Sequence, residues 1–447
     1  MGGADFAHTL VALALLLAAA HGVGHLFTLL RQPRVIGEIA GGLVLGPTLL
    51  GYLWPDLQAR VFPTEGSVAA VLGWASQLGL LLLMFCSGAE MRSLFRRDES
   101  RLVGLVTVTG VVLPFAAGAL LFRFLDSEEL LGPAQNGTAL MLVFGLAIAV
   151  TSIPVISRIM LDLGVIESSF ARIVLGVAVI EDVVVYVVLA LALGMVSVEG
   201  SADFGVPGLL GLEAGSTGSM VFHGLATLAV FALMLTLGPR GFRWTRRQRW
   251  NLVASSNPLA YLLLFIFGGA LLCIVLGVTA LFGAFLAGIA ASAAKGPKVV
   301  AARESIRSIS FAFFIPVYFA TVGLQLDLVR HFDIVFFAWF LLFACLAKSG
   351  SVYLGARLAG EGSRASRNLA IATNARGGPG IVLASVTYAA GIISQEFYAA
   401  LVMLALVTSM LAGTWLGHIV RSGRPLRPGD RATLPRAGVP GGPSTRN

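Results

Sequence analysis

Charged residues are scarce in this sequence. Of its 447 residues, 57% are hydrophobic and only 12% carry a formal charge, and the mean hydropathy is +0.87. These proportions leave too few polar side chains to cover a soluble domain of this length. The composition therefore predicts an all-α membrane protein that crosses the bilayer many times.

Cysteine is almost absent. Cys86, Cys273 and Cys345 each lie in an apolar run, so neither a disulfide framework nor a zinc site with paired ligands can be read from their spacing. The apolar runs also lack a His-Glu metal motif and an obvious Ser or Cys nucleophile with a histidine base. We therefore expect no cofactor and no enzyme activity.

Long apolar windows occupy most of the chain up to residue 420. Thirteen of them are long enough to cross about 30 Å of hydrocarbon. They are residues 6–30, 35–53, 66–89, 102–124, 138–160, 171–195, 219–238, 258–276, 278–294, 308–325, 334–356, 368–391 and 397–419. The eighth and ninth are separated by a minimal turn at Leu276-Gly277-Val278. Residues 421–447, rich in Pro, Gly and Arg, are predicted to form a disordered cytoplasmic tail.

The net charge of +8 reflects where the basic residues lie. Assigning alternate loops to opposite sides of the membrane places 26 of the 31 Lys and Arg residues on one side and only Arg60, Arg123 and Arg330 on the other. Basic loops face the cytoplasm, which predicts a plasma-membrane protein with its N-terminus outside and its C-terminus inside. The charge is thus explained without a nucleic-acid partner.

Two adjacent carboxylates, Glu181 and Asp182, lie inside a long apolar run. An ionised side chain at the centre of a spanning helix costs roughly 2.5 to 3.5 kcal/mol, so the pair requires partners or a function. Arg172 and Arg357 lie at the inner side of the membrane. Counted along a helix from these two arginines, Asp182 and Lys348 lie roughly 15 and 13 Å inside the membrane. Neighbouring helical residues point about 100° apart. One carboxylate can therefore pair with Lys348 while the other faces a water-filled cavity.

Two predicted spans are interrupted near their centres. The fifth contains Thr151-Ser152-Ile153-Pro154, and the twelfth contains Asn374-Ala375-Arg376-Gly377-Gly378-Pro379-Gly380. Non-helical backbone at this depth is tolerated where it lines a cavity or is buried in protein, and a simple proline kink is the alternative. With the seventh span as a linker, the two breaks occupy corresponding positions of an inverted repeat, which is typical of a transporter's binding site. Arg376 could offset negative helix ends or take part in gating.

The chain resembles a known family, the monovalent cation:proton antiporters, and specifically the second cation:proton antiporter family. That family includes bacterial Na⁺/H⁺ exchangers and glutathione-gated K⁺ efflux proteins. The resemblance covers about residues 6–420. It rests on the acidic pair, the two broken spans and three ordered motifs, which are QPRVIGEIAGGLVLGP at 32–47, LFGAFLAG at 281–288 and VGLQLD at 322–327.

The resemblance implies a homodimer in which a scaffold carries a core that moves across the membrane like an elevator. The scaffold falls on residues 6–89 and 258–325, the core on 102–195 and 334–419, and the linker helix on 219–238. The family's ion-binding carboxylate falls on Asp182, the preceding polar position on Glu181, and the embedded lysine of electrogenic members on Lys348. At 181 this chain has Glu, where electrogenic relatives have Asp and glutathione-gated ones Gln.

The mechanism we expect is competition at one site. Ionised Asp182, with oxygens from Thr151, Ser152 and Asn374, binds a dehydrated monovalent cation, with Na⁺ favoured and K⁺ accepted. Protonated Asp182 is neutral and releases the cation. A pair between Glu181 and Lys348 breaks and re-forms as the site loads. The substrates are then the cation and the proton, and the surrounding partners are membrane lipids.

Other interpretations of the function and of single residues remain open. An organic-anion or bile-acid-type carrier has a similar architecture, and Arg376 near helix ends would suit an anionic substrate. A channel is a further alternative. His21 and His25 share a helical face and are candidates for pH sensing or for packing in the scaffold, and Glu38 is a candidate for a structural or cavity-mouth role.

Overall fold

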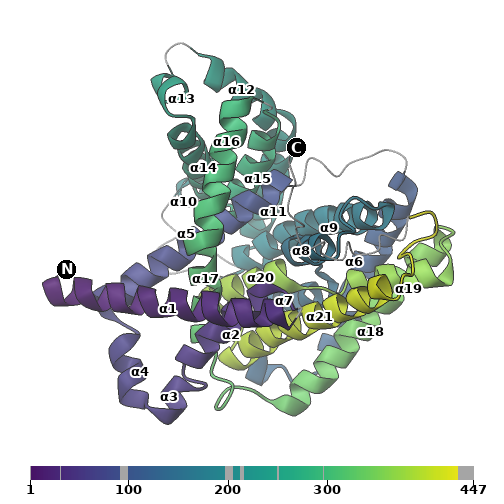
Figure 1. Ribbon diagram of the computed structural model, residues 1–447, viewed down its shortest axis with the longest axis horizontal. Helices are drawn as coiled ribbons and strands as arrows, with labels where there is room; N and C mark the ends of the chain where they lie inside the picture. The colour runs from purple at the N-terminus through teal and green to yellow at the C-terminus, as the bar shows by residue number, and fades with distance from the viewer. Residues whose placement is uncertain are drawn as a thin grey trace, which may run out of the picture.

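The computed structural model describes residues 2–30, 32–90, 99–196, 205–211, 216–248, 251–294 and 296–430. Within these ranges the regular elements are helices, and the one strand-like pairing is a single bridge between Leu131 and Ile393 (Figure 1). The first helices are α1 (Gly3–Leu29), α2 (Arg34–Leu45), α3 (Leu50–Leu53), α4 (Pro55–Val61), α5 (Gly66–Glu90), α6 (Ser100–Phe122), the 3₁₀ turn η3 (Glu128–Leu130), α7 (Gly137–Ala149), α8 (Ile153–Asp162) and α9 (Ser169–Gly194).

The second half of the chain is also helical. Its elements are α10 (Val206–Leu209), α11 (Thr217–Thr236), α12 (Gly238–Arg247), α13 (Leu252–Ser256), α14 (Pro258–Val275), α15 (Ala280–Ser292), α16 (Pro297–Ile309), the π-helical segment η4 (Ser310–Phe314), α17 (Ile315–Leu324), α18 (Ile334–Leu358), α19 (Ser363–Ala372), α20 (Gly377–Ala389) and α21 (Gln395–Arg421). The predicted all-α class is confirmed.

Nine helices in the described residues are long and apolar enough to cross a membrane, and a tenth span results if α11 and α12, bent by 53°, are taken together. Three further predicted spans contain shorter helices. Two are the interrupted pairs α7–α8 and α19–α20, and the third is α15, with 13 residues. The count of thirteen remains a prediction. The predicted turn between α14 and α15 is present at Gly277, whose φ of +72° favours glycine.

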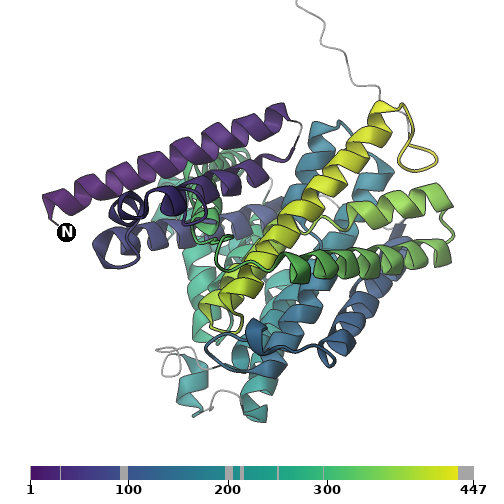
Figure 2. The same ribbon diagram turned by 90° about the horizontal axis from the view of Figure 1, so that it is seen from below.

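The helices pack in two groups (Figure 2). The frame consists of α1, α2, α5, α14, α15 and the continuous run α16–η4–α17. The α9 group consists of α6 to α9 and α18 to α21, and α11 packs against both α9 and α15. In Figure 2 the purple N-terminal helices lie on the left and the green and yellow helices α18, α19 and α21 lie on the right.

Glycines allow the frame helices to cross at backbone contact. Gly42 and Gly323 face each other where α2 crosses α17, and Gly88 and Gly288 do so where α5 crosses α15. A Cβ atom at any of the four would lie 1.8 to 2.2 Å from a carbonyl oxygen of the facing helix. No larger residue fits there without moving the backbone.

The structure describes nine residues after α21, which we call the strap (residues 422–430). The prediction of disorder from residue 421 is wrong for this part. Leu426 is only 4% exposed, and the Asp430 carboxylate accepts hydrogen bonds from the first backbone amides of α9. A Pro- and Gly-rich composition signals little burial, but it cannot reveal such individual polar contacts. Residues 431–447 lie outside the described residues.

Candidate functional site

The two carboxylates lie near the middle of α9, a 26-residue helix. The helix begins where Ser168 accepts a hydrogen bond from the Ala171 amide, which is a typical N-cap. Glu181 and Asp182 are each only 1% exposed. Burial of two adjacent acids requires that their charges be compensated or removed.

Lys348 of α18 compensates Glu181. Its ammonium nitrogen lies 2.8 Å from Glu181 Oε1, and both side chains are buried. The ammonium also donates to the Gly110 carbonyl of α6, at 2.8 Å, and to the Ala149 carbonyl at the end of α7. All three N–H donors are therefore used. Of the two pairings the sequence allowed, the structure forms the one with Glu181.

Gly110 was not singled out from the sequence. A Cβ atom at this position would lie 3.3 Å from Glu181 Oε1 and 2.9 Å from Val352 Cγ2. Glycine therefore gives the lysine access to the α6 carbonyl. No short motif marks this role, because the contact joins residues 238 positions apart.

Asp182 has no such compensation. Its Oδ1 is buried without a hydrogen-bond partner in the described part of the chain, as is Glu181 Oε2. Nor does Asp182 form an ion pair within those ranges. This isolated carboxylate is the most unusual group of the site, because an unpaired buried charge is strongly unfavourable.

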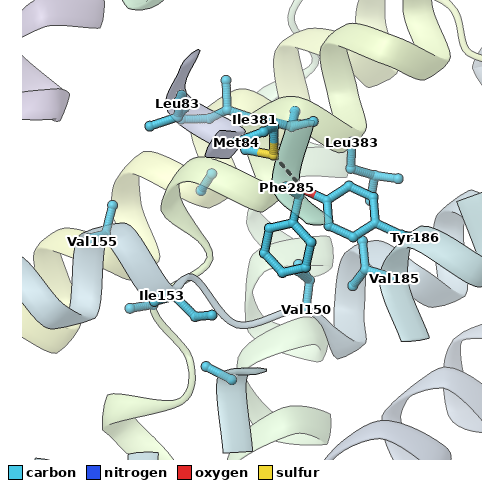
Figure 3. Close-up of a cluster of buried hydrophobic side chains, with 14 of the residues drawn as sticks. Leu83, Met84, Val150, Ile153, Val155, Val185, Tyr186, Phe285, Ile381 and Leu383 are labelled. Carbon is cyan, nitrogen blue, oxygen red and sulfur yellow. Dashed lines mark hydrogen bonds between the residues drawn. The ribbon is translucent and has the colours of Figure 1, made fainter. Parts of the chain in front are cut away.

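Tyr186 lies one helical turn after Asp182 and shares its face of α9. Its ring packs against Phe282 and Phe285 of α15, with centroids 5.3 and 5.4 Å away. Its hydroxyl donates to the sulfur of Met84 on α5 (Figure 3). Apolar side chains from α5, α8, α20 and the break before α8 belong to the same buried cluster as this tyrosine, namely Leu83, Val150, Ile153, Val155, Ile381 and Leu383. The Asp182 face of α9 thus meets the frame through an apolar layer.

Both predicted helix interruptions are present and contact each other. Residues 150–152 separate α7 from α8, and residues 373–376 separate α19 from α20. The Ser152 amide donates to the Ala375 carbonyl at 2.6 Å, and the Thr151 hydroxyl donates to the Thr373 carbonyl at 2.6 Å. The two breaks are therefore held together by direct hydrogen bonds.

Ser152 caps two helices at once. Its Oγ accepts from the Val155 amide of α8 at 3.4 Å and from the Gly378 amide of α20 at 3.0 Å. A hydroxyl has two acceptor lone pairs, so both are engaged. The side-chain oxygen of Asn374 is also engaged, because it accepts from Arg376 at 2.7 Å. Of the three residues expected to assist Asp182, Thr151 alone has a side-chain oxygen that accepts no backbone hydrogen bond or guanidinium contact among the described residues; its hydroxyl donates to Thr373, and its side chain also interacts with Glu181.

Arg376 is 1% exposed and makes five hydrogen bonds through its guanidinium. Nε donates to Ala147 O, and Nη2 donates to Ile148 O and Ala344 O. Nη1 donates to the backbone and side-chain oxygens of Asn374. Together with Lys348, it binds the last three carbonyls of α7, the negative end of that helix. These contacts are those of helix-end compensation.

Glu38 and His21 lie in a separate cluster within the frame. Glu38 Oε1 is 3.2 Å from Arg34 Nε, and a nitrogen of the same guanidinium contacts His21 Nδ1. His21 Nε2 lies 2.8 Å from the Ala312 carbonyl of η4. These contacts join α1, α2 and η4, which agrees with structural roles for Glu38 and His21. His25 is exposed and its role stays a prediction.

A family model described as sodium/hydrogen exchanger, transmembrane, matches residues 12–422. The Na⁺/H⁺-K⁺ antiporter GerN of Bacillus cereus is 28% identical, over 91% of this chain and 95% of GerN. The K⁺/H⁺ antiporter 1 of Saccharomyces cerevisiae is 29% identical over 86% of this chain, which spans only 43% of the yeast protein. The sodium proton antiporter MjNhaP1 of Methanocaldococcus jannaschii, solved at pH 8, has the same fold, with a TM-score of 0.61 at 16% identity over 93% of this chain and 98% of that one.

Proposed function

This chain belongs to the sodium/hydrogen exchanger family of membrane proteins, and we propose that it exchanges protons for monovalent cations by alternating access. Na⁺ is the favoured cation and K⁺ a second substrate. The antiporters it is similar to are named for Na⁺, for K⁺ or for both. The exchange takes place in the plasma membrane, with the basic loops and the strap on the cytoplasmic side.

The single observation that carries this proposal is the buried carboxylate of Asp182, whose Oδ1 has no hydrogen-bond partner among the described residues. An ionised carboxylate in this position is unfavourable until a counter-charge arrives. A proton or a metal cation can supply that charge, but the two exclude each other at the same oxygens. Competition between them couples the flux of one to the flux of the other.

We propose that Asp182 binds the transported cation or the proton, and that Glu181 regulates this site. Glu181 already has the Lys348 ammonium as its counter-charge, so it does not need a transported cation. Thr151 is the first additional ligand, because its hydroxyl caps no helix and binds no guanidinium among the described residues. Ser152 and Asn374 can join only by exchanging their present partners.

The division into frame and α9 group supports the proposed elevator motion of a core relative to a scaffold. The frame crossings also support the proposed inverted repeat. In that repeat the second span corresponds to the ninth and the third to the tenth, so α2 corresponds to α15 and α5 to α17. The crossing of α2 with α17 then corresponds to that of α15 with α5, and both contain facing glycines. The proposed homodimer would join two frames.

The contacts of Arg376 disfavour the organic-anion carrier. A guanidinium has five N–H donors, and Arg376 already makes five hydrogen bonds to protein oxygens. It therefore has no donor left for an anionic substrate.

The test is exchange in proteoliposomes with an internal pH dye, adding Na⁺, K⁺ and Li⁺ in turn. We expect cation-evoked proton movement for the wild type and none for Asp182→Asn, with the thermal unfolding midpoint of the variant close to that of the wild type or higher. Glu129→Gln, which removes an exposed loop carboxylate, is the matched control and should transport normally. Near-normal exchange by Asp182→Asn would refute the assignment.

A further inference from the structure

Two basic side chains, one buried and one half-buried, connect the same three helices at two different levels. Lys348, on α18, binds Gly110 of α6 and Glu181 of α9 at the middle of the α9 group. Arg427, on the strap, binds residues at the ends of those same helices. The contacts of Arg427, which we call the junction, lie well outside the candidate site.

Arg427 connects the strap to three segments. Its Nε and Nη2 lie 3.0 and 2.7 Å from Glu361 Oε1, just after α18. Its Nη1 lies 3.4 Å from Oε1 of Glu99, the residue before α6, and 3.1 Å from Oγ of Ser169, the first residue of α9. Glu99 in turn pairs with Arg172 of α9 at 3.4 Å. This is an ion-pair network, which is worth more than an isolated surface pair.

Two neighbouring residues fix the strap on either side of Arg427. The Leu426 carbonyl accepts from Asn368 Nδ2 of α19 at 2.9 Å. The Asp430 carboxylate accepts from the Ser169 and Phe170 amides at 2.9 and 3.2 Å, where an anion stabilises the helix N-terminus. A cavity of about 710 Å³ lies between the strap and the α8–α9 turn. The strap is therefore attached by these polar contacts and by the buried Leu426 side chain.

We infer that Arg427 is a positioning residue for the Asp182 site, because it ties the ends of α6, α9 and α18 whose central residues form the Gly110–Lys348–Glu181 cluster. The inference rests on the proposed function only in assigning exchange to that cluster. Ser169 precedes Glu181 by twelve residues, roughly 18 Å of helix. A helix fixed at both levels keeps its register, whereas one fixed at the cluster alone can tilt about it.

Arg427 remains charged throughout the relevant pH range. The hydrogen bonds it donates to Glu361 raise the pKa of its guanidinium above the usual range. A change in the pH dependence of exchange on replacing Arg427 therefore cannot come from titration of Arg427 itself. It would come either from Glu99 and Glu361, which lose a counter-charge, or from altered geometry at the buried cluster, and hydrogen exchange around the cluster distinguishes the two.

The experiment compares Arg427→Gln with Arg424→Gln in the full chain. Arg424 lies on the same strap but is exposed, and its side chain makes no ion pair in the part of the chain described. Hydrogen–deuterium exchange is followed at residues 169–171, and also at residues 108–112 and 178–184 around the cluster. The pH profile of cation-evoked proton movement and the apparent KM for Na⁺ are measured in proteoliposomes.

For Arg427→Gln we expect roughly tenfold faster hydrogen exchange at residues 169–171, as for loss of a charged hydrogen bond. We also expect faster exchange around the cluster and a displaced pH profile, and Arg424→Gln should match the wild type in all readouts. Faster exchange confined to the strap and residues 169–171, with an unchanged pH profile, would overturn the inference. If Arg427→Gln does not fold, Arg427→Lys and Glu361→Gln weaken the same junction and are scored by the same readouts. Hydrogen exchange needs no transport, so failure of the proposed function would be recognised separately, by absent wild-type proton movement.

Discussion

Lys348 Nζ lies 2.8 Å from Glu181 Oε1, and neither side chain is more than 1% exposed. Such a pair is balanced only while both partners are present, because each charge has lost its hydration. The stability of the α9 group and the state of the acidic pair are therefore linked through one contact.

Breaking this pair on one side should destabilise the protein strongly. We expect Lys348→Gln to cost about 3 to 5 kcal/mol, because Glu181 becomes an uncompensated buried charge. The double variant Glu181→Gln, Lys348→Gln should recover part of that loss. Thermal unfolding midpoints in detergent provide the measurement. The exposed pair Arg158–Asp162 is the control, and Arg158→Gln should cost less than about 1 kcal/mol. A double variant less stable than Lys348→Gln would contradict this account.

Loss of the Ser152 hydroxyl should affect two helices. Ser152→Ala leaves the Val155 and Gly378 amides without their acceptor, and a lost cap typically costs about 1 kcal/mol per helix. Ser394 caps α21 alone through the Phe397 amide, so Ser394→Ala is the matched control. We expect about twice the loss for Ser152→Ala, measured by thermal unfolding. Equal losses would show that the second cap contributes nothing.

Alanine at a frame crossing should not be tolerated. A Cβ atom at Gly88 would lie 2.0 Å from the Phe285 carbonyl oxygen, whereas a Cβ atom at Gly104 of α6 would meet nothing within 4 Å. Overpacking against backbone costs about 1 to 3 kcal/mol or more, so Gly88→Ala should lower the yield of folded protein and its unfolding midpoint. Gly104→Ala should be neutral or slightly stabilising, because alanine has the higher helix propensity. Similar behaviour of the two variants would contradict the backbone contact.

The parts of the site that the sequence predicted are those with a local signature. Charged residues inside apolar runs identified Glu181, Asp182, Lys348 and Arg376, and clusters of helix breakers located both interruptions. These signals are strong because lipid tolerates neither feature without a compensating contact.

The remaining contacts have no local signature. Lys348 and Arg376 bind backbone carbonyls of α6 and α7, and every residue carries a carbonyl, so the partner could not be read from residue type. The double cap at Ser152 depends on how two distant breaks meet. The strap was missed because Arg427 and Asp430 find their partners more than 60 positions away.

The glycine crossings of the frame have a mechanical consequence. Where two backbones touch, no side chain is available to change rotamer, so α2 and α17, or α5 and α15, cannot slide past each other without clashes. The seam between the frame and the α9 group is different, because Tyr186 reaches a methionine sulfur and Tyr398 reaches the Val322 carbonyl at 3.3 Å. Such side-chain contacts can be remade after small torsional rotations. The crossings are thus stiff, and compliance is concentrated at the two phenol rings of the seam, of which Tyr186 lies one helical turn from Asp182.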